Sequence, residues 1–305
     1  DYFFSNGAKK IPKISNMPTL YDKFLKHFVN EDKESYDYIV KWTANALQDR
    51  NYCILTTIGT QGIGKGVLGS IFKMLFGKKN FHAGADRMFK GTFNYQIANK
   101  RMVYCDEILI KSKEEEDKLK LVVNDSIEIE RKGYDAEEIT NYANFYISSN
   151  NLDAIKITAD DRRFSIVDLT DKKLMKVMNK KEIESLLYPE NIKKLAHYLW
   201  HYDVNSDEML QVFKSRRTEM VRANSLKEWE EWFVFNYCSE HAGKTKKWMD
   251  VKSDIQDEFP FNVGRTRLQN LMHIYPECFK LKCTTDGDKQ SVWVIEFKKG
   301  AVYEV

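Results

Sequence analysis

The sequence has few cysteines and no long apolar run. No two cysteines have the close spacing of a zinc site; they are Cys53, Cys105, Cys238, Cys278 and Cys283. We therefore expect the buried, reduced thiols of a cytoplasmic protein. No apolar run approaches the roughly 18 residues that a membrane span needs, and no signal peptide opens the chain. We expect a soluble protein that is not exported.

The sequence also lacks an excess of charge of one sign. Its 48 lysines and arginines face 45 aspartates and glutamates, which leaves a formal net charge of +3. This balance neither requires nor excludes a nucleic-acid partner, so a local basic surface would have to provide that contact. A length of 305 residues with 43% hydrophobic content fits a globular protein of about two domains. Because the chain begins with Asp1 rather than Met, we expect it to be part of a longer protein.

The patterning predicts three segments. Residues 1–50 contain a polar arm, followed by apolar residues at helical spacing. Residues 51–203 alternate short apolar runs with polar helices, which indicates an α/β core with buried strands, and end in a helical extension. Residues 204–305 contain helices followed by two apolar runs around the turn-forming sequence TDGD. Helices followed by a hairpin are typical of a small winged-helix-like domain.

A glycine-rich loop, GTQGIGKG, carries the sharpest signal. It follows the apolar run CILTTI and precedes the helical stretch VLGSIFKMLF, as a phosphate-binding loop requires. Glycines let backbone N–H groups turn toward a phosphate, the helix N-terminus adds partial positive charge, and Lys65 supplies a full charge for the β- and γ-phosphates. The residues expected to contact a nucleotide are Gly59, Thr60, Gln61, Gly62, Ile63, Gly64, Lys65, Gly66 and Val67.

One position departs from the usual phosphate-binding loop. Gly66 stands where Ser or Thr normally provides a hydroxyl ligand to Mg²⁺. Two alternatives to an active ATPase therefore stay open. The loop binds nucleotide but hydrolyses it poorly, or it is a glycine-rich turn without function.

Two further apolar runs end in polar residues. MVYCDE ends in Asp106 and Glu107, and NFYISSN ends in Asn150. Strand carboxyl ends line the ligand crevice of an open α/β sheet, so these side chains are expected to face the phosphates. Asp106 is the expected Mg²⁺ ligand, Glu107 the general base, and Asn150 a hydrogen-bonding partner of the attacking water or the γ-phosphate. The alternative is that ordinary polar side chains end these strands at the solvent.

The order GTQGIGKG, MVYCDE, NFYISSN and RRFSIVDL resembles that of the superfamily-three helicases of small DNA viruses, phages and plasmids. The lead-in VKWTANALQDRNYCILTTIG also resembles the helicase-like C-terminal part of phage primase-polymerases. The resemblance covers roughly residues 20–200. It implies an AAA+-like P-loop NTPase core that uses ATP and Mg²⁺, assembles as a homo-oligomeric, hexameric ring around single-stranded DNA, and follows an upstream primase or polymerase domain.

The resemblance also implies two roles outside the loop. Arg163, with Arg162 in reserve, is the expected arginine finger that completes the ATP site of a neighbouring subunit. The alternating sequence IEIERKGYDAEEI predicts a hairpin around Gly133, and in the family such a hairpin grips DNA in the central channel. The expected DNA-binding residues are Arg131, Lys132 and Tyr134. Alternatively, the arginines pair with Asp160 or Asp161 at the surface, and the hairpin is a solvated element with incidental charges.

These observations together predict an ATP-dependent helicase or translocase acting on single-stranded DNA in phage or plasmid genome replication. One alternative is a ring that binds nucleotide, hydrolyses it poorly, and holds DNA for a fused primase-polymerase. A second alternative is an unrelated P-loop enzyme such as a small-molecule kinase, which would need no ring.

Overall fold

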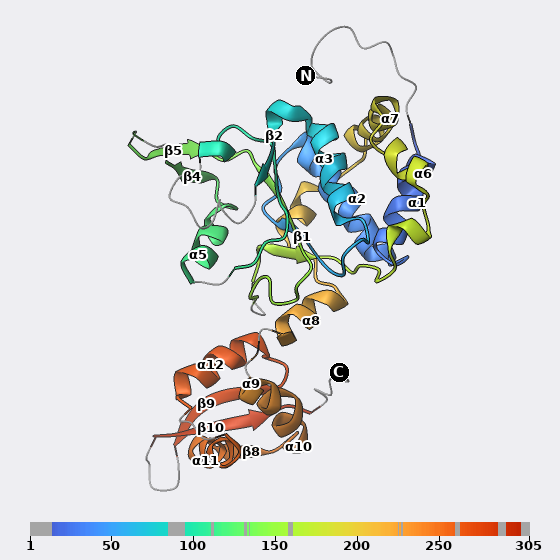
Figure 1. The fold of residues 1–305 in the computed structure, drawn as a ribbon. Helices are drawn as coiled ribbons and strands as arrows, with labels where there is room; N and C mark the ends of the chain where they lie inside the picture. Colours follow the sequence, from blue (N-terminus) through green and yellow to red (C-terminus); the bar gives the residue numbers. More distant parts are fainter. Residues whose placement is uncertain are drawn as a thin grey trace. The chain divides into compact units, whose positions relative to one another are not determined.

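The computed structural model describes residues 14–84, 95–110, 113–130, 133, 135–157, 161–224, 226, 228–259, 263–285 and 291–299. The chain forms two compact units (Figure 1). The first unit consists of residues 1–155 and 162–221, and the second of residues 156–161 and 222–305. None of the helices described is long and apolar enough to cross a membrane.

A parallel five-stranded sheet forms the centre of the first unit. Its order is β2–β3–β6–β1–β7, and every neighbouring pair is parallel. The strands are β1 (Ile54–Ile58), β2 (Phe81–Gly84), β3 (Met102–Cys105), β6 (Asn144–Ser149) and β7 (Phe164–Ile166). The prediction of an α/β fold with buried strands is confirmed. β2 was not predicted, because Phe81 is its one buried residue and it contains no apolar run.

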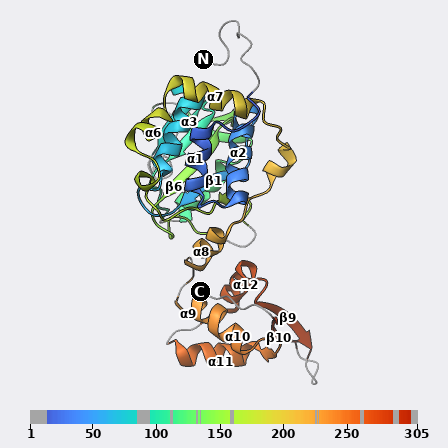
Figure 2. The ribbon, with the colours of Figure 1, turned by 90° about the vertical axis from the view of Figure 1, so that its right-hand side faces the viewer.

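Helices cover one face of this sheet. Figures 1 and 2 show α1, α2, α3, α6 and α7 gathered on the same side of the strands. The helices described in the unit are α1 (Thr19–Phe28), α2 (Lys33–Gln48), α3 (Lys65–Asn80), α5 (Lys113–Leu121), α6 (Lys180–Ser185) and α7 (Pro189–Trp200). The helix α8 (Arg216–Asn224) begins in this unit and ends in the second. Short 3-10 helices lie at η1 (Tyr95–Ile97), η2 (Leu174–Lys176) and η3 (Ser206–Leu210).

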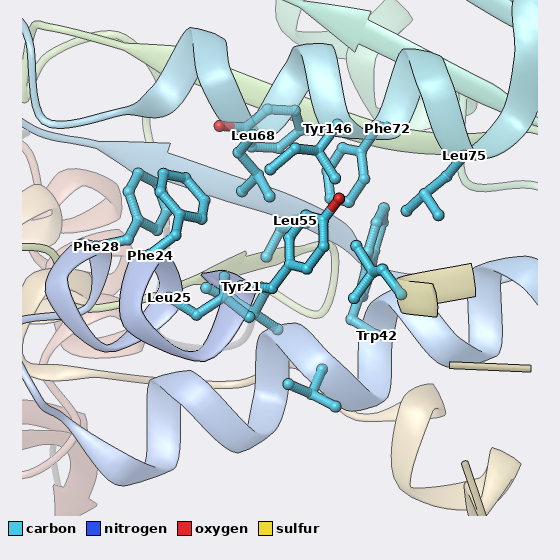
Figure 3. Packing of buried hydrophobic residues seen from close by; sticks show 14 of the residues in the cluster. Tyr21, Phe24, Leu25, Phe28, Trp42, Leu55, Leu68, Phe72, Leu75 and Tyr146 are labelled. Carbon is cyan, nitrogen blue, oxygen red and sulfur yellow. The ribbon is translucent and has the colours of Figure 1, made fainter. Parts of the chain in front are cut away.

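Aromatic side chains fill the space between the helices and the sheet. Figure 3 shows Tyr21 and Phe24 of α1, Trp42 of α2, Phe72 of α3 and Tyr146 of β6 turned toward one another. The ring of Phe72 meets the edge of Tyr146 at 5.2 Å between centroids, and Trp42 lies 5.9 Å from Phe72. Edge-on and tilted aromatic pairs add to the free energy of burying their apolar surface. The helical lead-in is therefore part of the core that supports β1 and α3.

A two-stranded hairpin belongs to the same unit. β4 (Ser126–Ile129) pairs antiparallel with β5 (Glu137–Thr140), with Ile127 opposite Ile139. In Figure 1 it protrudes from the side of the unit on which β2 forms the sheet edge. The hairpin predicted from the alternating sequence is confirmed. The three residues expected to bind DNA, Arg131, Lys132 and Tyr134, lie outside the described residues.

The second unit is a helical layer on a three-stranded antiparallel sheet of order β8–β10–β9. Its helical elements are α9 (Glu228–Trp232), the π-helical turn η4 (Phe233–Tyr237), α10 (Cys238–Glu240), α11 (Trp248–Glu258) and α12 (Arg265–Ile274). Its strands are β8 (Thr245–Lys247), β9 (Phe279–Thr285) and β10 (Ser291–Phe297). The predicted pairing of CFKLKC with SVWVIEF is confirmed, with Cys283 opposite Trp293.

The boundary between the units differs from the predicted one. The C-terminal segment of the second unit starts at Arg222, whereas the change in sequence pattern placed the boundary at residue 204. Residues 204–221 belong to the first unit because their apolar side chains pack there. Met209 is part of its core, and Phe213 stacks on Tyr38 at 4.7 Å between ring centroids.

Candidate functional site

The strand order brings three chain segments to one edge of the parallel sheet. β6 lies between β1 and β3, with Ser149 beside Ile58 and Ile147 beside Cys105. The residues that follow these strands are therefore neighbours at the carboxyl edge, where open α/β sheets hold their ligands. They surround a cavity of about 450 Å³, a volume typical of small-molecule sites. Its lining is Gln61, Gly62, Gly64, Lys65, Gly66, Val67, Asp106, Glu107, Asn150, Leu174, Met175 and Ile183.

The loop between β1 and α3 depends on its glycines. Gly62 and Gly64 have φ angles of 88° and 118°, in the region that side chains disfavour. A Cβ atom at Gly64 would also lie 2.9 Å from a ring carbon of Phe24 on α1, closer than van der Waals contact allows. Any larger residue at Gly64 would therefore strain the backbone and displace the core. Gly66 differs, because a Cβ atom there meets nothing within 4 Å.

Lys65 is the buried cation of the site. It is 7% exposed, and its Nζ donates hydrogen bonds to the carbonyl oxygens of Gly59 at 2.5 Å and Thr60 at 2.8 Å. A third bond runs to Oδ1 of Asn150 at 2.8 Å. All three acceptors are neutral, so none of these bonds compensates the charge of the ammonium group.

This environment disfavours the charged form of the lysine. Burial lowers the pKa of Lys65 to about 8, and the positive charge of Arg217 acts in the same direction. The negative charges of Asp106 and Glu107 oppose this shift without cancelling it. An anionic ligand would stabilise the charged form of this buried amine, whose present hydrogen-bond partners are neutral.

The two carboxylates are exposed at the cavity but anchored differently. Oδ1 of Asp106 accepts a hydrogen bond from the hydroxyl of Ser148, whose oxygen lies 3.2 Å from the hydroxyl of Tyr104. Glu107 has a φ angle of 51°, a left-handed conformation that is uncommon for a residue with a side chain. Its Oε1 lies 3.4 Å from Nδ2 of Asn150. Strained backbone of this kind clusters at functional sites.

Buried hydroxyl groups tie the strands beneath the loop together. Tyr146 of β6 donates a hydrogen bond to the carbonyl oxygen of Lys65 at 3.1 Å and lies 2.9 Å from the hydroxyl of Thr57. Its ring stacks on Tyr104 of β3 at 4.9 Å between centroids. Burial raises the pKa of both phenols, so each stays a neutral hydrogen-bonding group. The start of α3 is therefore fixed relative to the strand that precedes the carboxylates.

The segment that follows β7 supports the loop from the other side of β1. The backbone N–H of Leu174 donates a hydrogen bond to the carbonyl oxygen of Gly62 at 2.9 Å. The side chain of Leu169 lies 3.2 Å from the position a Cβ atom would take at Gly59. Sequence reasoning missed this segment, as it missed Ser148 and Tyr146. Tyr146 and Ser148 lie inside NFYISSN and Leu169 inside RRFSIVDL, but nothing in these runs marks their roles, which arise from strand order and not from spacing along the chain.

The donor set around the cavity fits Mg²⁺ bound together with a nucleotide. Asp106 and Glu107 offer the hard oxygen ligands that Mg²⁺ prefers. Within the described part of the chain, no group of three or more His, Cys, Asp or Glu could hold a metal ion by itself. Mg²⁺ commonly uses one or two carboxylates and takes its other ligands from water and substrate phosphates. Two carboxylates beside a glycine-rich loop and a buried lysine match that pattern.

Arg162 and Arg163 lie at the opposite edge of the sheet from the cavity. Arg163 directly precedes β7, and its carbonyl oxygen accepts a hydrogen bond from the backbone N–H of Ile54, the first residue of β1. β1 has 5 residues, so a strand of roughly 16 Å separates this edge from the loop. The structure therefore does not bring Arg163 together with Lys65 of the same chain.

Comparisons with known proteins show what this chain is similar to. Residues 57–163 match a family described as a family of unknown function (DUF5906). The DNA primase-polymerase of Nitratiruptor phage NrS-1 is 26% identical over 222 residues. The match covers 70% of this chain and 30% of the relative, so the chain spans less than a third of that protein. The sequence similarity indicates common descent with the phage primase-polymerase.

Solved structures show where in that relative the similarity lies. The apo structure of the NrS-1 C-terminal region has a TM-score of 0.71 to this chain at 17% identity, covering 94% of this chain and 77% of the other. An A-form apo structure of the same region gives a TM-score of 0.69 at 19% identity, covering 94% and 78%. The chain therefore shares the fold of the C-terminal region of the phage protein.

Proposed function

We propose that this chain is an AAA+-like P-loop ATPase that moves single-stranded DNA as a ring during phage genome replication. The observation that carries the proposal is the convergence of Lys65, Asp106, Glu107 and Asn150 on one cavity at the carboxyl edge of the sheet. Common descent with a DNA primase-polymerase supports a place in DNA replication. The proposed relatives in mechanism are the superfamily-three helicases.

The loop and the buried lysine bind the polyphosphate in this proposal. Backbone N–H groups around Gly62 and Gly64 and the N-terminus of α3 face the phosphates, which receive the partial positive charge of the helix. The Lys65 amine exchanges its carbonyl acceptors for phosphate oxygens. Because the amine now has only neutral partners, a charged partner offsets the cost of its burial.

The polar residues beyond the lysine act on the terminal phosphate. Mg²⁺ held at Asp106 would neutralise charge that builds up on the phosphate oxygens. The Ser148 hydroxyl holds the Asp106 carboxylate in place. Glu107 accepts a proton from the attacking water, and Asn150, which lies between Lys65 and Glu107, orients that water.

Ring assembly is the part of the proposal that Arg163 supports. The residue lies a strand's length away from its own cavity, so it can complete only the site of another subunit. A guanidinium group offers fixed donors for charge on the transferred phosphoryl group. The β4–β5 hairpin, with Lys132 at its expected tip, carries the DNA contact in this scheme.

Gly66 favours a second candidate function. The position has open space where other P-loops carry a hydroxyl ligand to Mg²⁺, so the loop binds nucleotide with one metal ligand fewer. In this alternative, nucleotide binding stabilises a ring that holds DNA for a fused primase-polymerase, and turnover is slow or absent.

Phosphate release separates the two functions. ATP turnover by the wild-type chain is measured with and without single-stranded DNA, beside Glu107→Gln. If the chain is a motor, single-stranded DNA stimulates its ATP turnover. In Glu107→Gln the turnover rate then falls by about 10²-fold or more, a typical contribution of a general base, while ATP still binds. Absence of turnover under every DNA condition, with ATP binding intact, favours the holding ring. A native mass that stays monomeric with ATP and DNA rules out both.

A further inference from the structure

One wall of the cavity has no role in the phosphate chemistry described above. Leu174 and Met175 belong to η2 and Ile183 to α6, which both follow β7 in the chain. The backbone N–H of Leu174 bonds to the carbonyl oxygen of Gly62, so this wall lies beside the glycine-rich loop. Met175 lines the cavity and is 63% exposed, so its thioether is accessible to a ligand bound there.

From this wall we infer that the site holds the base of a nucleoside triphosphate by apolar contact alone and does not discriminate among bases. The inference rests on the proposed nucleotide-binding function. A flat base placed between the wall and the start of α3 meets Val67, Leu174, Met175 and Ile183. A thioether makes favourable contact with an aromatic ring of any kind, so Met175 suits purines and pyrimidines equally.

The wall has few groups that could read a base edge. The four side chains that the base would meet carry no hydrogen-bond donor, and several backbone N–H groups of the same segments are already bonded within the protein. Leu174 N donates to Gly62 O, Val177 N to Leu174 O, and Ile183 N to Asn179 O, all at 2.9–3.0 Å. A site discriminates strongly when the wrong ligand leaves buried polar groups of the protein without hydrogen-bond partners. An apolar pocket discriminates only weakly between similar ligands.

Among the described residues of the lining, Gln61 is the one polar side chain that the phosphate scheme leaves unused. It is exposed on the loop, where water competes for its amide. If Gln61 read the base, its loss would change the order of preference among nucleotides. This side chain therefore provides an internal test of the inference.

The experiment compares the affinities of the wild-type chain for ATP, GTP, CTP, UTP and inorganic tripolyphosphate, each with Mg²⁺, by calorimetry. We expect the four nucleotides to bind within about tenfold of one another, and all more tightly than tripolyphosphate. Met175→Ala weakens all four by a similar factor of about two to ten, the range of a sulfur–aromatic contact, and leaves tripolyphosphate unchanged. Val177→Ala is the matched control, because Val177 is 41% exposed on the same segment and does not line the cavity.

Three results would each overturn this inference without contradicting the proposed function. One is a preference for a single base of more than about a hundredfold, which only specific hydrogen bonds provide. Another is an affinity for tripolyphosphate equal to that for ATP, because the wall would then contribute nothing to nucleotide binding. A third is a change of base preference in Gln61→Ala. A wild-type chain that binds none of the five probes instead contradicts the proposed function itself.

Discussion

The amine of Lys65 and the amide of Asn150 are joined by a hydrogen bond of 2.8 Å across the top of the sheet. The other end of the same amide faces Glu107 Oε1 at 3.4 Å. Lysine, amide and carboxylate thus form one chain of contacts that starts on the loop and ends at the acidic pair. Strand β6 makes this possible because it lies between β1 and β3. A ligand that pulls the lysine toward itself would also release the amide.

The pH dependence of ATP affinity follows from the burial of Lys65. Burial lowers the pKa of its amine to about 8 in the free protein, so the amine is charged below that pH and neutral above it. Phosphate oxygens stabilise the charged form, and ATP affinity should therefore fall as the pH rises through 8. Calorimetry from pH 7 to 9.5 measures the effect. A flat profile in this range would show that the lysine charge does not take part in binding.

A hydroxyl at residue 66 should raise turnover if the missing Mg²⁺ ligand limits the natural protein. A Cβ atom at Gly66 meets nothing within 4 Å, so Gly66→Ser and Gly66→Thr should fold normally. Gly66→Ala is the control, since it adds the carbon without the oxygen. We expect faster phosphate release in the Ser or Thr variant and no gain in the Ala variant. Equal rates in all four proteins would mean that the hydroxyl is not what limits turnover.

The fold was largely predictable from the sequence, because most of its strands have a recognisable pattern within their own residues. Buried parallel strands read as continuous apolar runs, and β1, β3, β6 and β7 each follow this rule. β2 did not, because it lies at the sheet edge and Phe81 is its one buried residue. The sequence pattern changes at residue 204 but the compact units divide at Arg222, because Met209 packs into the first unit through contacts distant in sequence.

The candidate site was predictable only where residues lie at strand ends. Asp106 and Asn150 directly follow β3 and β6, and Lys65 ends the glycine-rich loop that follows β1. Their common edge could therefore be inferred before the strand order was known. Ser148 and Tyr146 lie inside a strand whose residues are all buried, and nothing in the sequence separates them from ordinary core residues. Met175 and Ile183 lie on short helical segments after β7 that no motif marks.

Arg163 should act on the site of a neighbouring subunit. Arg163→Ala and Lys65→Ala are each expected to be inactive alone. A mixture of the two should recover part of the ATPase activity, because some interfaces pair an intact loop with an intact arginine. Arg162→Ala mixed with Lys65→Ala is the companion experiment for the adjacent residue. No recovery in co-assembled rings, with an active wild type, would place Arg163 outside the reaction.

The tip of the β4–β5 hairpin should grip single-stranded DNA. Each phosphate contact on a single strand adds about 0.7 to the salt dependence of binding, and a ring repeats the contact in every subunit. Lys132→Ala should therefore weaken DNA binding and flatten its salt dependence while ATP affinity stays unchanged. Tyr134→Ala should cost roughly 1–3 kcal/mol with the salt dependence preserved, because stacking is insensitive to salt. Wild-type binding in both variants would move the DNA contact to another surface, with Lys214–Arg222 and Lys244–Trp248 as the next basic stretches to test.

Calorimetric titration of ATP into the wild-type chain, Lys65→Ala and Lys73→Ala tests the central claim most directly. Lys73 lies exposed on the same helix, α3, so its variant removes an equal charge away from the cavity. The account predicts that wild type and Lys73→Ala bind ATP equally, and that Lys65→Ala loses binding while its thermal unfolding shows an intact fold. An unchanged ATP affinity in folded Lys65→Ala would contradict the assignment of residues 59–66 as the phosphate-binding loop.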